Sequence, residues 1–197
     1  MIAVLDYGAG NVGSVLKAVR FLGYEAESVK GAGRLEAAQE IILPGQGHFG
    51  AMMKALDEQG LIGPLRRAID HGTPFFGICL GLQALYEGSD EANGVGGLGL
   101  IAGRVQKLEG VFKVPHLGWN QLEFDRASRL LRGVEPGSFV YYCHSYYGPV
   151  TAESVALTEY GRKFAAAVEF GNVQAVQFHP EKSGDTGLTV LRNFLEQ

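Results

Sequence analysis

The first half of the chain alternates between short apolar runs, which are typical of buried strands, and segments with helical periodicity. In chain order these segments are IAVL, VGSVLKAVRFL, YEAESV, EIIL, FGAMMKALDEQG and GPLRRAID. Two parallel strands need a long crossover between them, and a helix is the usual crossover. The alternation therefore predicts a parallel sheet covered by helices.

The sequence changes character after Gly96. The later segments are short and rich in β-formers, with Gly, Pro or Asn between several of them: RVQKLE, NQLEF, SFVYYCHSYY, SVALTEY, FAAAVEF and VQAVQF. They predict antiparallel strands that extend the same sheet, and TGLTVLRNFLE predicts a final helix. No repeat or linker interrupts the chain, so we expect one α/β domain over residues 1–197, with a mixed central sheet (parallel N-terminal part, antiparallel additions) flanked by helices.

Charge and cysteine usage exclude several kinds of partner. The 197 residues carry a net charge of −4 without a dense run of Lys and Arg, so neither nucleic acid nor an anionic membrane is an expected partner. The start, MIAVLDYG, has no positively charged leader, and no apolar run is long enough for a bilayer. Cys79 and Cys143 lie far apart and offer no disulfide framework or zinc spacing. We expect a cytoplasmic protein without metal or other cofactor.

Cys79 lies where a strand pattern becomes a helix pattern, in TPFFGICLGLQALYE. Gly77 and Gly81 flank it at two residues on either side, as required at a sharp nucleophile elbow where larger side chains would collide. The following helix N-terminus favours a thiolate through its dipole and free N–H groups. Cys79 is therefore a candidate nucleophile. The alternative is a buried structural thiol, because free cysteine is among the most buried residue types.

A thiol nucleophile needs a base, and the best candidate lies in VQAVQFHPEKSG. Pro180 biases His179 towards an extended conformation, in which residues two apart point the same way, so Glu181 can orient the imidazole. Nucleophile, base and orienter would then form a triad. An ordinary turn histidine is the alternative. His144 is the rival base, and Cys143 is the rival nucleophile, although its strand-like surroundings indicate a packed thiol.

Acyl transfer also needs donors for an oxyanion. The N–H of Leu80, the residue after the nucleophile, is one by the geometry of the elbow. The loop in IILPGQGHFG, with Gly45 and Gly47, offers a second amide that can turn inward, or else is an ordinary glycine turn. Another glycine motif, GAGNVG at 8–13, matches the dinucleotide pattern GxGxxG, but the second strand ends in VKG and lacks the confirming acid. We interpret it as a tight turn.

Together these motifs resemble the class I, or triad, glutamine amidotransferases. The resemblance covers nearly the whole chain: the PGQG loop, GICLG with Gln83 after it, GLGLIAG at 97–103, and HPE. It implies that a cysteine attacks the side-chain amide of glutamine, releases ammonia and leaves a thioester for water. It also assigns candidate roles: Cys79 as nucleophile, His179 as acid and base, Glu181 as orienter, Gly47 and Leu80 as oxyanion donors, and Gln83, Glu91, His144, Ser145 and Tyr146 around the glutamine.

Three further stretches are similar to one branch of this family. LDYGAGNVGSV, KVPHLGWN and YYCHSYYGPV resemble the glutaminase subunits of imidazole glycerol phosphate synthase. The resemblance implies a heterodimer with a (β/α)8-barrel cyclase, which uses the ammonia to make imidazole glycerol phosphate and aminoimidazole carboxamide ribotide in histidine biosynthesis. Residues at positions that face the cyclase in this branch are Asn11, Trp119, Tyr141 and Lys182.

Two residues depart from the family pattern. Gln46 stands in the oxyanion loop where a small or aliphatic residue is expected, and Cys143 stands before HSY where an aliphatic residue is usual. Three alternative functions stay open: a glutaminase of another synthase, such as the one for pyridoxal phosphate, a non-catalytic regulatory module, and a cysteine peptidase. The WN and HSYY segments disfavour the first. The complete candidate triad disfavours the second, and HPE with the glutamine-pocket residues disfavours the third.

Overall fold

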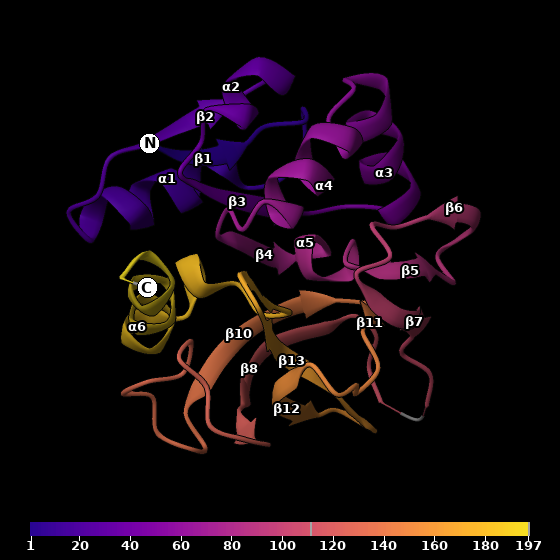
Figure 1. Cartoon of the computed structure of the whole chain (residues 1–197). Coiled ribbons are helices and arrows are strands. Elements are labelled where there is room, and N and C mark those ends of the chain that lie inside the picture. The colour runs from indigo at the N-terminus through magenta and orange to yellow at the C-terminus, as the bar shows by residue number, and fades with distance from the viewer. Residues whose placement is uncertain (111, 197) are drawn as a thin grey trace.

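The computed structural model describes residues 1–110 and 112–196, and in this part of the chain it contains a central sheet of eight strands (Figure 1). The order is β2-β1-β3-β4-β14-β13-β12-β9. The strands are β2 (Ala26–Val29), β1 (Ile2–Leu5), β3 (Glu40–Gly45), β4 (Phe75–Cys79), β14 (Val173–Val176), β13 (Lys163–Phe170), β12 (Ser154–Glu159) and β9 (Glu123–Phe124). The first five pair in parallel, and β13, β12 and β9 pair antiparallel.

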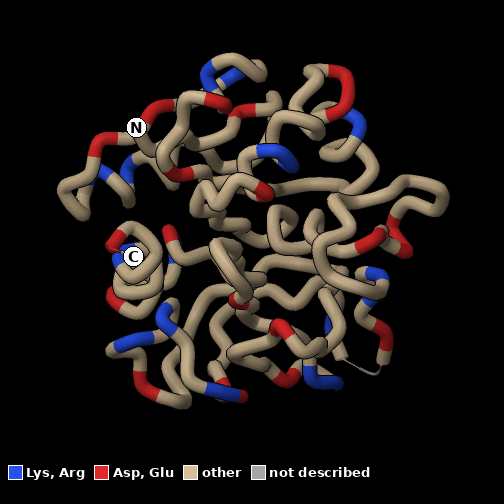
Figure 2. The backbone as a smooth tube through the Cα atoms, viewed as in Figure 1, with Lys and Arg blue, Asp and Glu red and all other residues tan. Residues whose placement is uncertain are grey.

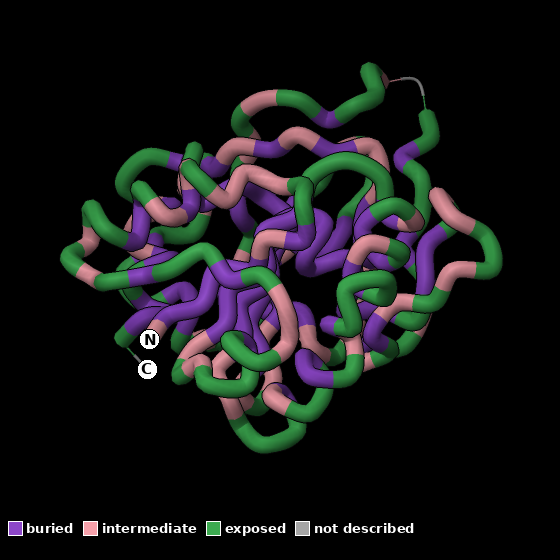
Figure 3. Tube along the Cα trace, turned by 90° about the horizontal axis from the view of Figure 1, so that it is seen from above, coloured by how far each residue is buried: buried purple, intermediate pink, exposed green. Residues whose placement is uncertain are grey.

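Helices cover both faces of the parallel part. They are α1 (Val12–Phe21), α2 (Ala32–Glu36), α3 (Phe49–Glu58), α4 (Ile62–Asp70) and α6 (Gly184–Leu195). Alternate residues of β3 divide between two cores: Ile42 packs in the core that includes α1 and α6, and Ile41 in the core that includes α3 and α4. Figure 3 shows these buried strands surrounded by exposed connections. A strand buried on both faces needs apolar residues throughout, which explains the continuous apolar runs.

The predicted fold class is confirmed, but two details are wrong. The helix after Cys79 is only α5 (Leu80–Gln83), and Tyr86–Ser89 is strand β5. The carbonyl of Ala84 accepts from Leu98 N at 2.7 Å, so it does not continue a helical ladder. Gly97 makes this approach possible, because a Cβ there would lie 2.2 Å from the Tyr86 carbonyl oxygen. The short helix α2 was not predicted.

The second error concerns the late strands, which do not all extend the central sheet. β10 (Phe139–His144) pairs with β8 (His116–Gln121) in a separate two-stranded ribbon. β11 (Tyr146–Tyr147) joins a third sheet with β7 (Ile101–Lys107), β5 and β6 (Ala92–Gly96). β14, predicted to be antiparallel, pairs in parallel with β4 and antiparallel with β13, so it lies between them. This insertion brings the end of β14 beside the end of β4, which carries Cys79.

Charged residues of both signs are interspersed over the surface (Figure 2). Within the described residues, no helix has the length and apolarity needed to cross a membrane. Those same residues contain no group of three or more His, Cys, Asp and Glu side chains arranged to hold a metal ion.

Candidate active site

Cys79 ends β4 in a strained backbone conformation. Its φ of 55° and ψ of −104° make it the one non-glycine residue with positive φ among residues 1–110 and 112–196. The flanking glycines permit this turn: a Cβ at Gly81 would lie 2.0 Å from the Leu43 carbonyl oxygen, and one at Gly77 would lie 2.7 Å from the Gly81 carbonyl oxygen. Strain at a single residue held by close backbone packing is typical of functional sites.

His179 lies three residues after β14 and adopts the extended conformation predicted from Pro180, with φ −100° and ψ 97°. Its Nδ1 lies 3.0 Å from Oε1 of Glu181, and the two side chains are 2% and 1% exposed. Burial alone would lower the pKa of His179, but the neighbouring Cys79 thiol and the Glu181 carboxylate outweigh burial and raise the pKa to about 10. The ring therefore holds a proton between sulfur and carboxylate.

A cavity of about 240 Å³ opens beside Cys79. The residues that line it come from the elbow, the loop after β3, the turn between β5 and β6, the residue before β8, and the segment from the end of β10 to the start of β11: Gln46, Gly47, Cys79, Leu80, Gln83, Glu91, Pro115, Cys143, His144, Ser145 and Tyr146. Every residue assigned to the glutamine by the family resemblance thus borders one cavity with the nucleophile candidate. Gln46 borders it too, as an exposed residue.

The two rival residues are placed differently from Cys79 and His179. Cys143 is half-buried and borders the cavity, so the prediction of a packed thiol is wrong. His144 uses both ring nitrogens within the protein: Nδ1 lies 2.8 Å from the Tyr146 carbonyl oxygen, and Nε2 lies 3.0 Å from Nδ1 of His116. With neither nitrogen available, His144 cannot act as the base in this arrangement.

The neighbouring groups determine which ring nitrogens of His116 and His144 carry a hydrogen. The Asn120 amide nitrogen, which can only donate, lies 3.3 Å from Nε2 of His116, so that nitrogen accepts and Nδ1 carries the hydrogen. His116 Nδ1–H therefore donates to His144 Nε2, and His144 Nδ1–H donates to the Tyr146 carbonyl oxygen. The chain of donors is complete only while both rings are neutral.

Acid should destabilise the fold through these two rings. Burial lowers the pKa of His144 to about 3 and that of His116 to about 4, from 6.5 in the unfolded chain. Their contribution to stability is fully present above pH 6.5 and is lost as the pH falls towards 3, because the unfolded chain then binds protons that the folded chain does not. The free energy of unfolding falls by about 1.4 kcal/mol per pH unit for each such proton. We expect His144→Asn to make thermal stability less dependent on pH between about pH 6 and about pH 4. The exposed His71→Asn serves as the control, and equal slopes in the two variants would contradict the prediction.

Glu91 and the loop after β3 complete the wall of the cavity. Oε2 of Glu91 accepts from Phe49 N at 2.7 Å, at the start of α3. Pro44 and Gly45 lie inside β3, where Gly45 is paired with Cys79. The part that can turn an amide inward is therefore the exposed stretch 46–48, in which Gly47 has φ 101°.

The four residues predicted to face a partner lie on neighbouring segments. Trp119 and Tyr141 are a cross-strand pair of the β8–β10 ribbon, with ring centroids 6.0 Å apart, and Trp119 is 55% exposed. Tyr141 N donates to Ser183 Oγ at 2.9 Å, which joins the ribbon to the turn that carries the exposed Lys182. Asn11 precedes α1, and α1 contacts the same turn.

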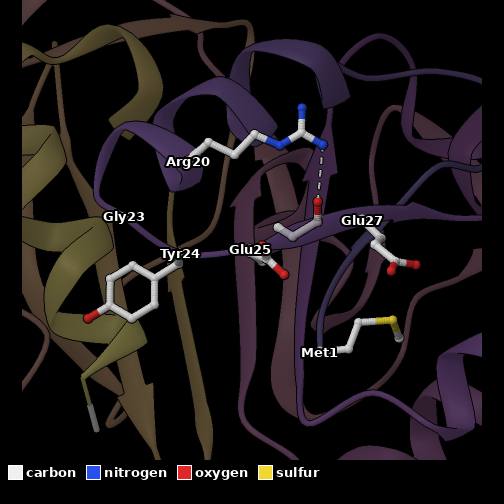
Figure 4. A pocket seen from close by; sticks show the side chains of 7 residues that line it. Met1, Arg20, Gly23, Tyr24, Glu25 and Glu27 are labelled. Carbon is white, nitrogen blue, oxygen red and sulfur yellow. Dashed lines mark hydrogen bonds between the residues drawn. The ribbon is translucent and has the colours of Figure 1, made fainter.

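A larger cavity of about 530 Å³ lies at the opposite end of the parallel strands, between α1 and β2 (Figure 4). Arg20 lies over it and donates to the Ala26 carbonyl oxygen at 3.2 Å. The residues that line it include no cysteine and no histidine: Met1, Arg20, Gly23, Tyr24, Glu25, Ala26 and Glu27. The volume of a cavity therefore does not identify the reactive site. The smaller cavity is the candidate because it borders the Cys79 thiol.

The chain belongs to the family described as Glutamine amidotransferase class-I, which it matches over residues 3–197. Within this family it is similar to proteins named imidazole glycerol phosphate synthase subunit HisH. It is 50% identical to the one from Methanothermobacter thermautotrophicus over 197 residues, covering 100% of this chain and 98% of that protein. It is 47% identical to the one from Moorella thermoacetica, over 99% of this chain and 94% of that protein.

Solved structures show the same fold. A crystal structure of a glutamine amidotransferase superimposes with a TM-score of 0.78, at 23% identity, over 99% of this chain and 97% of that one. A chain in the structure of PurLQS from Thermotoga maritima has a TM-score of 0.77, at 21% identity, over 99% of this chain and 97% of that one.

Proposed function

We propose that residues 1–197 form one glutaminase domain that hydrolyses glutamine to glutamate and ammonia and supplies the ammonia to imidazole glycerol phosphate synthase in histidine biosynthesis. The observation that carries the proposal is the buried His179–Glu181 pair, with 3.0 Å between Nδ1 and Oε1, next to a cysteine on a strained elbow that raises the pKa of His179. Relatives at 43–50% identity over nearly the whole chain have the corresponding subunit name.

The chemistry begins with the Cys79 sulfur, which attacks the side-chain amide carbon of glutamine. The N–H groups of Leu80 and Gly47 stabilise the negative oxygen that forms. His179 donates its proton to the leaving nitrogen, so ammonia departs and an acyl thioester remains. The sulfur has then lost its charge, which removes one of the interactions that raise the pKa of His179. The neutral ring can now take a proton from water, and water releases glutamate.

The cavity wall supplies groups for the amino acid end of glutamine. Glu91 presents a carboxylate suited to an ammonium group, and Phe49 N–H holds one of its oxygens. Gln83 and the segment 144–146 lie on the wall beside it. A charged pair and several neutral hydrogen bonds would fix the substrate with its amide at the elbow.

The β8–β10 ribbon supports docking on a partner, which we propose is a (β/α)8-barrel cyclase in a cytoplasmic heterodimer. Three of its outward-facing residues are large, apolar and exposed: Leu117 at 57%, Trp119 at 55% and Phe139 at 53%. Leu117 is opposite Cys143, which borders the cavity, so the outward face reaches the reactive site. A contiguous exposed apolar patch is typical of an interaction site, and the subunit names of the relatives favour this cyclase over the partner of another synthase.

A diazoketone analogue of glutamine tests this function on the purified chain. Its electrophilic carbon replaces the side-chain amide, so we expect it to alkylate Cys79 and to leave Cys143 unmodified, because only Cys79 has the elbow and the protonated His179 beside it. Peptide mass spectrometry over a time course measures the alkylation of Cys79 and of Cys143. An assay of glutamate release measures the loss of glutamine hydrolysis in the same samples. Excess glutamine should protect Cys79. Preferential labelling of Cys143 would mean that the nucleophile is wrongly assigned.

A further inference from the structure

The buried side chain of Gln177 contacts the Cys79 sulfur and has no role in the chemistry described above. We propose that Gln177 is a positioning residue for the nucleophile: its amide N–H holds the sulfur at the elbow in its charged form, and the orientation of that amide is set by Gln83 in the cavity wall. This inference rests on the proposed role of Cys79. It adds a residue that is neither a member of the triad nor part of the cavity wall.

The contacts of Gln177 form a short path between the cavity wall and the sulfur. Nε2 of Gln177 lies 3.5 Å from Sγ of Cys79, within the range of hydrogen bonds to sulfur, and its Oε1 accepts from Nε2 of Gln83 at 3.1 Å. Gln177 is fully buried, and Gln83 is 3% exposed. Gln177 and His179 follow β14 closely, and β14 lies beside β4, which is why both reach Cys79.

The direction of the Gln177 amide follows from a backbone carbonyl. The Tyr146 carbonyl oxygen can only accept, so the Gln83 group 2.7 Å from it must be the amino group. The same amino group faces Gln177 at 3.1 Å, so the Gln177 atom there must be the carbonyl oxygen. Its amino group is then forced to face the sulfur. Turning the Gln177 amide over would oppose two donors at Gln83 and place a carbonyl oxygen against the sulfur.

A donor in this position favours negative charge on the sulfur. The other titratable groups near Cys79 are His179 with its partner Glu181, the Tyr7 hydroxyl, and, around the cavity, Glu91, Cys143, His144 and Tyr146. Burial lowers the pKa of His144 to about 3, so that ring is neutral. Only His179 among them offers a positive charge, and it must give up its proton to the leaving group. A fixed neutral amide keeps its N–H throughout, so Gln177 holds the sulfur in place whether His179 is charged or neutral.

Alkylation of Cys79 by iodoacetamide tests the proposal without any turnover of glutamine. We compare the purified chain with Gln177→Met, which keeps the length and burial but removes the donor, and with Gln177→Glu, which opposes a carboxylate to the sulfur. Peptide mass spectrometry follows Cys79 across a range of pH. Loss of a hydrogen bond to a charged group predicts a roughly tenfold slower alkylation at neutral pH in Gln177→Met, with a pH midpoint shifted upward. Gln177→Glu should be slower still.

Gln174→Met is the matched control. Gln174 lies in β14, three residues before Gln177, and is equally buried, but its side-chain amide has no hydrogen-bond partner in the described structure. In Gln174→Met, the alkylation rate of Cys79 and its pH midpoint should equal those of the chain without a substitution, even if the thermal stability differs. An unchanged pH midpoint of Cys79 alkylation in Gln177→Met would overturn the proposal. Equal changes of that midpoint in Gln177→Met and in the control Gln174→Met would also overturn it. A chain that alkylates as expected but hydrolyses no glutamine even in complex with the cyclase and its nucleotide ligand would instead refute the proposed function.

Discussion

Cys79→Ala should abolish glutamine hydrolysis while the complex with the cyclase still makes product from added ammonium salts. Removal of a catalytic nucleophile typically lowers turnover by a factor on the order of 10⁴ or more. The ammonia-dependent reaction should survive because, in the proposed function, its chemistry takes place on the cyclase partner. Glutamate release and formation of the cyclase product are measured side by side, with glutamine or an ammonium salt as nitrogen source.

The ammonium salt reaction is also the control for folding and assembly in this experiment. A Cys79→Ala chain that no longer assembles would lose both activities, and thermal unfolding of the isolated chain would show why. Alanine at Cys79 must still adopt φ 55°, which is strained for any residue with a Cβ, so a modest change in stability is expected. Continued hydrolysis of glutamine by the variant would disprove the assignment of the nucleophile.

The isolated chain should be a poor glutaminase that becomes efficient on the cyclase carrying its nucleotide ligand. A partner ligand accelerates hydrolysis only if it binds better to the active arrangement, and coupling between sites is typically ~1–3 kcal/mol, or about 5- to 150-fold. The exposed stretch 46–48, with Gly47 at φ 101°, is the element we expect to turn an amide towards the oxyanion. Steady-state hydrolysis is measured for the chain alone, the complex, and the complex with nucleotide.

Trp119→Ala should weaken this activation. Truncating a tryptophan at the centre of an interface commonly costs about 2 kcal/mol or more in binding, which is about thirtyfold in affinity. Val150→Ala, an exposed apolar position outside the β8–β10 ribbon, is the matched control and should bind the cyclase normally. Full activity of the isolated chain, unaffected by partner and ligand, would instead indicate a free-standing glutaminase.

Much of the candidate site was predictable because its signals are local. The strained elbow follows from the spacing of Gly77, Cys79 and Gly81, and the extended His179 follows from Pro180. The contact between Gln177 and the sulfur was not predicted. It depends on the position of β14 beside β4, which brings the residues after β14 to Cys79. The donor chain through His116 likewise depends on the register of β8 against β10.

The sequence by itself determined strands β1 to β4, helices α1, α3 and α4, the nucleophile elbow and the family. Apolar periodicity and the steric limits of glycine and proline act within a few residues, so they can be read along the chain. The tertiary structure alone decided that the late strands divide among three sheets, that β14 lies between β4 and β13, and that helix α5 ends at Gln83. Strand partners are chosen by the sum of many weak contacts between distant segments, and no short stretch contains that sum.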